Sequence, residues 1–484
     1  MNIASNFGFP VAVFGTAFFV TFLTERLTRP SVQVGRSYAR FVIHGLIMGQ
    51  IYGLCAFLSG SAWLSGCVMV LLAVMGVVAS NIKWSLLGEP LLFSDVVVAQ
   101  SFLRNPKFYL FSIPPLARVA VVAIVLIVPA LFIYVSVEGL RPGTRITGLC
   151  MVVAASLGLR LVPASRWAPV PDISQDIGRL GLIGSLYLYW RRWQAEPDGA
   201  PPPPVPSTAR PARDVVVVVQ CESFADPYTL GLSETALPTM SGLRSAQAVA
   251  SAWGALQVSG FGAYTMRTEY GVLFGRTEAQ LGFRYFDPFL TAAREKEFAL
   301  PYRLGVAGYR SVFVHPHDLG FYGRDRLMPA IGFQSLIGDD AFAHAESASM
   351  PYTQDCDVAD AILRLVDAEG AEPLFVYAVT MENHGPWPNG KGEGVAHYLR
   401  HLQGSDQMLA ALVKGFQDRD CKATLVFFGD HRPSIPGSVV PGGARHTPFV
   451  VVDFPLSGHK NALSAQDISP AGLHDLIEAR ALER

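Results

Sequence analysis

Charged residues are scarce in this 484-residue sequence, and neither sign predominates. Only 16% of the residues are Asp, Glu, Lys or Arg, and 38 basic residues stand against 39 acidic ones, for a formal net charge of −1. No long basic stretch occurs anywhere along the chain. Because nucleic-acid binding depends on clustered Lys and Arg that neutralise phosphates, this composition argues against a nucleic-acid partner.

Cysteine is also scarce, and its six copies form no recognisable motif. No two of them have the CxxC spacing, so the sequence indicates neither a zinc knuckle nor a redox motif. A disulfide between Cys356 and Cys421 stays open, because spacing alone does not tell whether two sulfur atoms lie close enough.

Long apolar runs, in contrast, are abundant in the first third of the chain, and 50% of all residues are hydrophobic. Five runs approach the roughly 20 residues that a helix needs to cross a bilayer. These runs are 7–24, 41–59, 62–80, 119–137 and 146–163. No small-residue cleavage site follows the first run, which favours a membrane anchor over a signal peptide. We therefore expect a transmembrane helical domain of four or five spans over residues 1–165.

A change of composition follows the last apolar run. Residues 177–193 combine aromatic side chains with Arg191 and Arg192, which suits a helix in the lipid headgroup layer or an ordinary packed helix. Residues 197–213 contain four consecutive prolines, which favour a stiff extended spacer. We expect an interfacial helix and a proline-rich linker over 166–213, followed by a second domain over 214–484.

The second domain alternates short apolar strands with helical stretches. Val215 to Val219 show no polar alternation, so we expect a central strand of a parallel sheet, buried on both faces. Further buried strands are predicted at 311–315, 374–380, 423–429 and 447–453, and helices at 357–368 and 405–416. This alternation predicts a doubly wound α/β fold.

Three side chains with metal-binding chemistry follow two of these strands. Glu222 comes just after the valine strand, and Asp430 and His431 come directly after the strand at 423–429. Ligands of open α/β sheets bind at the carboxyl ends of the strands. Each residue alone reads as a loop acid or a capping histidine, but two carboxylates and an imidazole at matching strand ends predict a divalent cation site.

Thr265 is the candidate nucleophile. It stands where a glycine-containing loop turns into a helical stretch, so its hydroxyl should meet the positive end of the helix dipole. A threonine at such a place is most often only an N-cap. Beside a divalent cation, however, its hydroxyl can be deprotonated at neutral pH and attack a phosphate.

Five motifs, in this order along the chain, give the C-terminal domain a recognisable signature. They are a strand followed by Glu222 and Ser, a helix-opening Thr265, an aromatic-x-Arg-Asp motif at 322–325, Asn followed by His384, and a strand followed by Gly, Asp430 and His431. In these motifs residues 214–484 resemble the alkaline phosphatase superfamily, and within it the membrane-anchored lipoteichoic acid synthase and phosphoglycerol transferase branch. The helical anchor matches that branch only in general layout.

The resemblance implies a site for one catalytic ion, commonly manganese, with zinc or magnesium as alternatives. The four ligands would be Glu222, Thr265, Asp430 and His431. Thr265 would attack the phosphodiester of a phospholipid headgroup, form a phospho-threonine and release diacylglycerol.

The resemblance also implies three substrate-binding residues. His384 would bind the phosphoryl group or relay a proton, and Arg324 would clamp phosphate oxygens. Tyr322 stands where the family often has tryptophan. Alternatively, Tyr322 and Arg324 form a surface turn in which Arg324 pairs with Asp325.

The implied function is a metal-dependent transferase that moves phosphoglycerol from a phospholipid to a glycan outside the cytoplasm, either a capsule, a lipopolysaccharide or a periplasmic glucan. A phosphoethanolamine transferase and a sulfatase-like phosphodiesterase are alternatives, and an inactive membrane scaffold is one of another class. The run from Thr265 to Glu269 lacks the Cys/Ser-x-Pro-x-Arg context of sulfatases. A second full set of metal ligands is not evident, and all four candidate ligands are retained, which disfavours a dinuclear phosphatase and a scaffold.

The expected partners are therefore a donor, phosphatidylglycerol or phosphatidylethanolamine, a glycan acceptor and membrane lipids. We expect a multi-pass protein of the inner (cytoplasmic) membrane with its catalytic domain on the periplasmic side. Five spans would export that domain but place eight basic residues between 26 and 118 outside, against the positive-inside tendency. Four spans remove the conflict if 146–163, which is short and contains Arg160, does not fully cross.

Three further histidines have open roles. His315 and His317 are expected to satisfy loop carbonyls rather than bind a second ion. His446 precedes the strand at 447–453, and neither motif nor spacing decides whether it faces the site.

Overall fold

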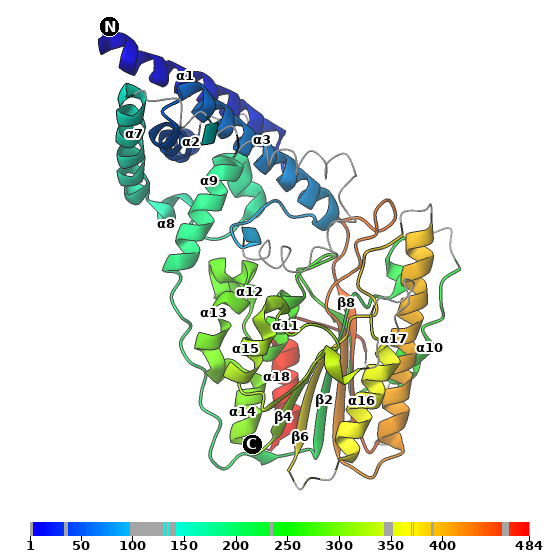
Figure 1. Ribbon diagram of the computed structural model, residues 1–484. Coiled ribbons are helices and arrows are strands. Elements are labelled where there is room, and N and C mark those ends of the chain that lie inside the picture. Colours follow the sequence, from blue (N-terminus) through cyan, green and yellow to red (C-terminus); the bar gives the residue numbers. More distant parts are fainter. Residues whose placement is uncertain are drawn as a thin grey trace. The chain divides into compact units, whose positions relative to one another are not determined.

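The computed structural model divides the chain into two compact units, Met1–Glu196 and Pro197–Arg484, both traced in Figure 1. The described residues are 3–32, 37–96, 130, 133–134, 142–232, 236–342, 352–368, 370, 372–388, 392–456 and 464–483.

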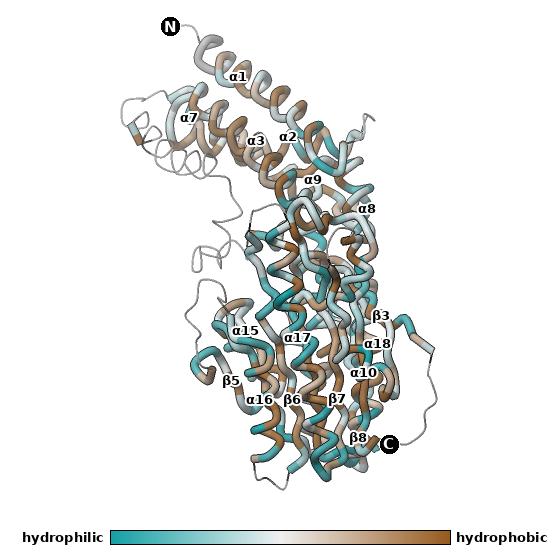
Figure 2. The backbone as a smooth tube through the Cα atoms, turned by 90° about the vertical axis from the view of Figure 1, so that its right-hand side faces the viewer, coloured by the Kyte–Doolittle hydropathy of each residue, from teal (hydrophilic) through white to brown (hydrophobic). Residues whose placement is uncertain are grey.

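The N-terminal unit consists of helices whose hydrophobic residues are drawn brown in Figure 2. The described helices of this unit with more than one turn are α1 (Ile3–Thr24), α2 (Tyr38–Ser59), α3 (Ala62–Leu87), α7 (Pro142–Leu161) and α9 (Ile173–Ala195).

Four helical segments of this unit are long and apolar enough to cross a membrane. They are Gly8–Leu27, Tyr38–Ser59, Ala62–Leu87 and Pro142–Leu161. They coincide with four of the five predicted runs. The remaining run, 119–137, lies outside the described residues except for 130, 133 and 134.

Glycines let α2 and α7 approach each other closely. A Cβ atom on Gly53 would lie 2.8 Å from the carbonyl oxygen of Gly148, and a Cβ on Gly148 would lie 2.6 Å from that of Gly53. Small residues at such crossings let the backbones of two apolar helices approach closely, which strengthens van der Waals packing between them.

The aromatic-rich stretch 177–193 lies within α9 and packs inside the N-terminal unit. Leu180, Leu182 and Leu188 are almost fully buried. The helix breaks at Gly181, whose φ of 76° is left-handed. Just after the break, the backbone N–H of Ile183 donates a hydrogen bond to the buried Glu25 carboxylate at 2.9 Å. This stretch therefore packs as a helix against the rest of its unit, and its location in the lipid headgroup layer stays a prediction.

The C-terminal unit is built on an eight-stranded sheet of order β5-β4-β6-β2-β7-β8-β3-β9. The strands are β2 (Val215–Cys221), β3 (Ala252–Leu256), β4 (Arg310–Val314), β5 (Ser335–Ile337), β6 (Leu374–Val379), β7 (Ala423–Gly429), β8 (Thr447–Phe454) and β9 (Gln466–Ile468). β2 runs parallel to both of its neighbours, β6 and β7, as predicted for a central strand.

Helices cover both faces of this sheet, which confirms the predicted α/β class (Figure 1). One face packs on α10 (Ser241–Val249), α16 (Asp355–Asp367) and α17 (Glu393–Gln417). The other packs on α11 (Thr265–Phe274), α14 (Leu300–Val306) and α18 (Pro470–Ala481). Each face therefore has its own hydrophobic core.

The five valines of β2 show why the strand lacks polar alternation. Val217 and Val219 point into the first core, while Val216 and Val218 point into the second, because successive side chains of a strand face opposite ways. All four are fully buried. Each contributes roughly 1.5–3 kcal/mol by leaving water, so a polar residue at any of them would disrupt a core.

Two details differ from the sequence-based expectation. β8 is antiparallel to β7, so the sheet is mixed rather than uniformly parallel. The helix expected at 405–416 begins at Glu393, because the polar segment before residue 405 still places Val395, Tyr398 and Leu402 on the buried face. Cys356 and Cys421 are free thiols.

The proline-rich segment lies along the C-terminal unit. The carbonyl of Pro203 accepts a hydrogen bond from Arg303 Nη1 at 3.1 Å. β1 (Arg210–Pro211) pairs with β10 (Leu482–Glu483), so this segment is tied to the end of the chain.

Candidate active site

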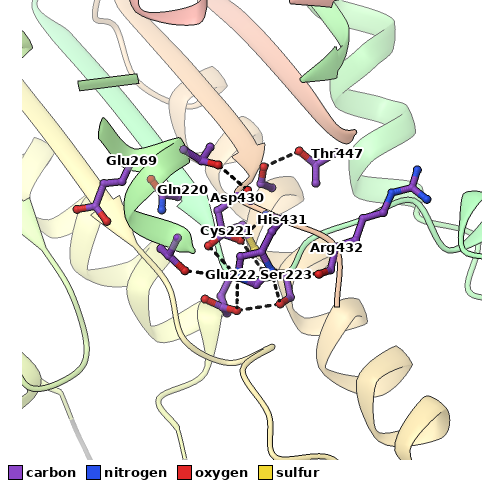
Figure 3. A network of polar contacts seen from close by, with 12 residues as sticks. Gln220, Cys221, Glu222, Ser223, Glu269, Asp430, His431, Arg432 and Thr447 are labelled. Atoms are coloured by element: carbon purple, nitrogen blue, oxygen red, sulfur yellow. Dashed lines mark hydrogen bonds and ion pairs between the residues drawn. The ribbon is translucent and has the colours of Figure 1, made fainter. Parts of the chain in front are cut away.

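Glu222, Asp430 and His431 lie together at the carboxyl edge of the central strands (Figure 3). The register explains this, because Cys221 at the end of β2 pairs with Gly429 at the end of β7. His431 Nε2 lies 3.5 Å from Glu222 Oε1 and 3.6 Å from Asp430 Oδ2. All three side chains are buried, so their ligand atoms face one small volume that suits a single ion.

Gly429 allows the two strand ends to meet. A Cβ atom at this position would lie 1.9 Å from the carbonyl oxygen of Phe224, in the loop after β2. No side chain fits there without moving that loop. The glycine that precedes Asp430 in the sequence is thus required by the close approach of the segment that carries Glu222.

Hydrogen bonds hold the two carboxylates in place. Asp430 Oδ1 accepts from the backbone N–H groups of Ser223 at 2.9 Å and His431 at 2.8 Å. The Ser223 hydroxyl donates to Glu222 Oε1 at 2.8 Å. Asp430 Oδ2, in contrast, is buried and has no hydrogen-bond partner among the described residues. A buried carboxylate oxygen that faces two other ligand atoms is what a divalent cation would satisfy.

The electrostatics of the cluster also fit a cation. Burial and the nearby Glu222 charge raise the pKa of Asp430 to about 7. Burial alone would lower the pKa of His431, but the charges of Asp430 and Glu222 outweigh it and raise that pKa. The cluster therefore attracts positive charge, which a bound cation would supply in place of protons.

The Thr265 hydroxyl faces this cluster. Its Oγ1 lies 3.4 Å from His431 Nε2, and the residue is partly accessible. α11 begins at Thr265 itself, and Tyr264 occupies the N-cap position, so the alternative role of Thr265 as the N-cap is wrong. Its oxygen is left to face the site at the positive end of a ten-residue helix.

Strained backbone surrounds these residues. Ser223, Tyr264 and Tyr322 have positive φ angles of 49°, 75° and 57°. Only one other non-glycine residue in the described part of the chain, Met240, has a positive φ. A side chain makes a positive φ angle energetically unfavourable, so residues other than glycine rarely adopt one. Such strained residues cluster at functional sites, where the backbone must hold side chains in a particular geometry.

Arg324 lies inside the protein and not on a surface turn. Its Nε and Nη2 donate to Glu269 at 3.2 and 2.6 Å, and only 2% of its surface is exposed. Asp325 instead lies 3.9 Å from Arg326 in an exposed pair, so the alternative pairing of Arg324 with Asp325 is wrong. The ring of Tyr322 lies 5.3 Å from the Arg324 guanidinium, which keeps the two predicted substrate-binding residues together.

His384 lies in the loop after β6 and is partly buried. Its Nδ1 is 2.7 Å from the Gly385 carbonyl and 3.1 Å from the Tyr352 hydroxyl. Burial lowers the pKa of His315 and His317, and the proximity of His384 adds to this effect, which places the three histidines in one neighbourhood.

His315 and His446 have defined positions. His315 Nδ1 lies 3.0 Å from the carbonyl of Val379, the last residue of β6, so its partner is a strand-end carbonyl and not the expected loop carbonyl. Its Nε2 lies 3.2 Å from Arg324 Nη1. His446 Nε2 lies 3.1 Å from Nη2 of Arg432, the residue after His431. Burial and the Arg432 charge lower the pKa of His446, so this imidazole is neutral beside the site.

Several polar residues around the site were not identified from the sequence. Ser223 follows Glu222 directly, but nothing local indicates that its N–H binds Asp430. Glu269 reads as an ordinary helix residue, four positions after Thr265. Asp355 and Glu382 form a buried pair of acids that the sequence places 27 positions apart. These residues differ from polar residues of the surface only in being buried, and the sequence does not show the burial of a single polar residue.

Comparison with known proteins gives one family match and several similar proteins. A family model described as Sulfatase matches residues 214–476, more than half of the chain. The capsular polysaccharide biosynthesis protein RkpI of Rhizobium meliloti (strain 1021) is 29% identical over 400 residues, which cover 77% of this chain and 74% of that protein.

Two solved structures are similar at low identity. The lipoteichoic acid synthase LtaP from Listeria monocytogenes is 17% identical with a TM-score of 0.43, covering 55% of this chain and 70% of that one. The Streptococcus pyogenes phosphoglycerol transferase GacH, solved with sn-glycerol-1-phosphate, is 17% identical with a TM-score of 0.44, covering 58% and 76%.

Proposed function

The chain belongs to the sulfatase family, and on that premise we propose that it is a membrane-anchored, metal-dependent transferase that moves phosphoglycerol from a phospholipid to a glycan outside the cytoplasm. The observation that carries this proposal is the Thr265 hydroxyl, which faces the buried cluster of Glu222, Asp430 and His431 at the start of α11. A threonine hydroxyl beside a bound divalent cation would be activated for nucleophilic attack.

Glu222, Thr265, Asp430 and His431 would hold one divalent cation, for which we propose manganese, with zinc or magnesium as alternatives. When bound, such a cation lowers the pKa of a coordinated hydroxyl and neutralises phosphate charge. Thr265 would lose its hydroxyl proton to solvent, and its Oγ1 would form a bond to phosphorus as the bond from phosphorus to the diacylglycerol oxygen breaks and that oxygen takes a proton from His384. The product is a phosphoglycerol ester of Thr265, and free diacylglycerol leaves.

His384 and Arg324 would serve the transferring group. We assign His384 as the residue that gives a proton to the leaving oxygen and later takes one from the acceptor hydroxyl. Arg324 has five N–H groups, and the contacts with Glu269 and His315 account for three. Under this proposal its two remaining N–H groups would bind phosphate oxygens, and Tyr322 would stack beside them.

The similarity to RkpI, a capsular polysaccharide biosynthesis protein, supports a surface glycan as the acceptor. The four apolar helices support a multi-pass membrane protein, and we propose that residues 214–484 act on the periplasmic side of the inner membrane. The alternative of a phosphoethanolamine transferase differs only in the donor headgroup. Sulfatase activity is disfavoured because position 265 is threonine, in agreement with the sequence-based argument.

The test uses the purified full-length protein in detergent with phosphatidylglycerol or phosphatidylethanolamine. We expect diacylglycerol release from phosphatidylglycerol, and a Thr265 peptide whose mass is raised by one phosphoglycerol group. His384→Ala should accumulate that peptide, because the second transfer stalls. Thr265→Ala should release no diacylglycerol.

Thr424→Ala is the matched control. Thr424 is a buried threonine at the opposite end of β7, where its hydroxyl donates to Asp453 at 2.6 Å. This variant should keep the wild-type rate. Diacylglycerol release by Thr265→Ala at the wild-type rate would refute the covalent mechanism, and release from phosphatidylethanolamine alone would favour the alternative donor.

A further inference from the structure

Glu269 is a buried carboxylate with no role in the function proposed so far. It lies on α11, one helical turn after Thr265, and none of its surface is exposed. Figure 3 shows its side chain pointing away from Glu222, Asp430 and His431. It therefore serves something other than the metal cluster.

Both carboxylate oxygens of Glu269 bind Arg324. Oε1 accepts from Arg324 Nε at 3.2 Å and Oε2 from Nη2 at 2.6 Å, which is a bidentate pair. A pair of this kind defines the plane and the direction of the guanidinium, because two parallel hydrogen bonds leave it no free rotation.

We propose that Glu269 is a positioning residue that holds Arg324 at a set distance and orientation from the nucleophile Thr265. This inference rests on the proposed function, in which Arg324 binds the phosphate that Thr265 attacks. Glu269 and Thr265 lie on the same helix, α11. The length of this helix therefore sets the distance between the attacking oxygen of Thr265 and the guanidinium of Arg324.

The contacts on the other side of Arg324 complete the orientation. Arg324 Nη1 lies 3.2 Å from His315 Nε2, and His315 Nδ1 lies 3.0 Å from the Val379 carbonyl. Both distances are satisfied at once by a neutral His315 that carries its proton on Nδ1. The edge of the Arg324 guanidinium formed by Nε and Nη2 thus binds Glu269. Under the proposed function, phosphate would bind the two N–H groups that Glu269 and His315 do not use.

The backbone before Arg324 gives a second reason to expect positioning rather than simple stabilisation. Tyr322 and Gly323, the two residues before it, are both left-handed, with φ of 57° and 66°. The chain enters α15 (Arg324–Ala330) through this turn. This strained turn places the guanidinium of Arg324 against the carboxylate of Glu269 on α11, the helix that carries Thr265. Backbone strain of this kind is typical of sites whose geometry is maintained for function.

A double-mutant cycle tests the inference on the full-length protein in detergent, with phosphatidylglycerol as the substrate. Glu269→Gln keeps the shape but loses the charge, and Arg324→Lys keeps the charge but loses the fork. Each should raise KM for phosphatidylglycerol about tenfold, the effect of one charge-assisted hydrogen bond. If Glu269 acts through Arg324, the double variant should resemble Arg324→Lys alone. Effects that multiply to about a hundredfold, or an unchanged KM in Glu269→Gln, would overturn the proposal.

Glu295→Gln is the matched control. Glu295 is also buried and binds Tyr270 and Arg276, but it does not contact Arg324. This variant should lower the melting temperature and leave KM unchanged. A KM rise equal to that of Glu269→Gln would show that any lost buried charge has the same effect, and would also overturn the proposal.

Glu269→Asp provides a second route if the neutral variant does not fold. It retains the charge, but its side chain is one methylene shorter and cannot meet both nitrogens. KM should rise while bound metal, measured by elemental analysis, stays at the wild-type level. A wild-type KM would refute the inference. Absence of diacylglycerol release by the wild-type protein would instead refute the proposed function.

Discussion

Replacing Glu382 by glutamine should stabilise the protein at neutral pH, which is unusual for a buried residue. Glu382 is 8% exposed, and its Oε2 accepts from the backbone N–H of Asp355, another buried acid, at 2.7 Å. Among the described residues, no lysine or arginine forms an ion pair with either carboxyl. Burial and the charge of Asp355 raise the pKa of Glu382 from its ordinary 4.5 to about 8.

The sign and size of the effect follow from this shift. The folded state keeps the Glu382 proton between pH 4.5 and about 8, while the unfolded state loses it. The contribution of Glu382 to the free energy of unfolding is therefore at its highest below pH 4.5. It falls by about 1.4 kcal/mol per pH unit as the pH rises from 4.5 to about 8. The loss is on the order of 3 kcal/mol at pH 7 and under about 1 kcal/mol at pH 5. Glutamine resembles the protonated acid and escapes this loss.

The assay is the melting temperature of the full-length protein and of Glu382→Gln at pH 5, 6, 7 and 8. The gap should widen with pH and reach roughly 6–12 °C at pH 7, because a domain of about 150–250 residues shifts its melting temperature by about 2–4 °C per kcal/mol. Glu372→Gln, at an exposed position, should show no such widening. A gap that is constant with pH would refute the reasoning, because it would mean that the wild-type carboxyl does not retain its proton.

Three further predictions address the site and the membrane unit. Asp430→Ala should lose bound metal, measured by elemental analysis, and all turnover, while circular dichroism shows a folded protein; full metal occupancy would contradict the site. Thr265→Ser should retain part of the diacylglycerol release, because the hydroxyl remains while the methyl group that restricts its rotamer is lost; a rate equal to that of Thr265→Ala would count against the nucleophile. Single cysteines at positions 34 and 205, in a protein without the natural six, should react differently with a membrane-impermeant thiol reagent if four spans cross the membrane and alike if five do. Position 205 should react from outside in both cases, and its protection in spheroplasts would place the catalytic unit in the cytoplasm.

The sequence by itself determined those features that depend on short segments. An unbroken run of valines predicts a strand buried on both faces, and β2 is the central strand with a core on each side. Residues that directly follow two such strands must lie at one edge of the sheet, which is why Glu222, Asp430 and His431 could be grouped before their distances were known. Apolar runs of about 20 residues predict membrane helices by length alone.

Only the tertiary structure decided which polar residues are buried and what they face. Glu269 on α11 and Arg324 at the start of α15 are 55 positions apart, and only the folded chain brings them together as an ion pair. Asp355 and Glu382 share a proton-retaining pocket because α16 begins beside the end of β6. The antiparallel direction of β8 likewise depends on its partner β7. Local patterns reflect the burial of one segment at a time, whereas the pairing of charges depends on desolvation by elements that are distant in the chain, and so it appears only when the fold is complete.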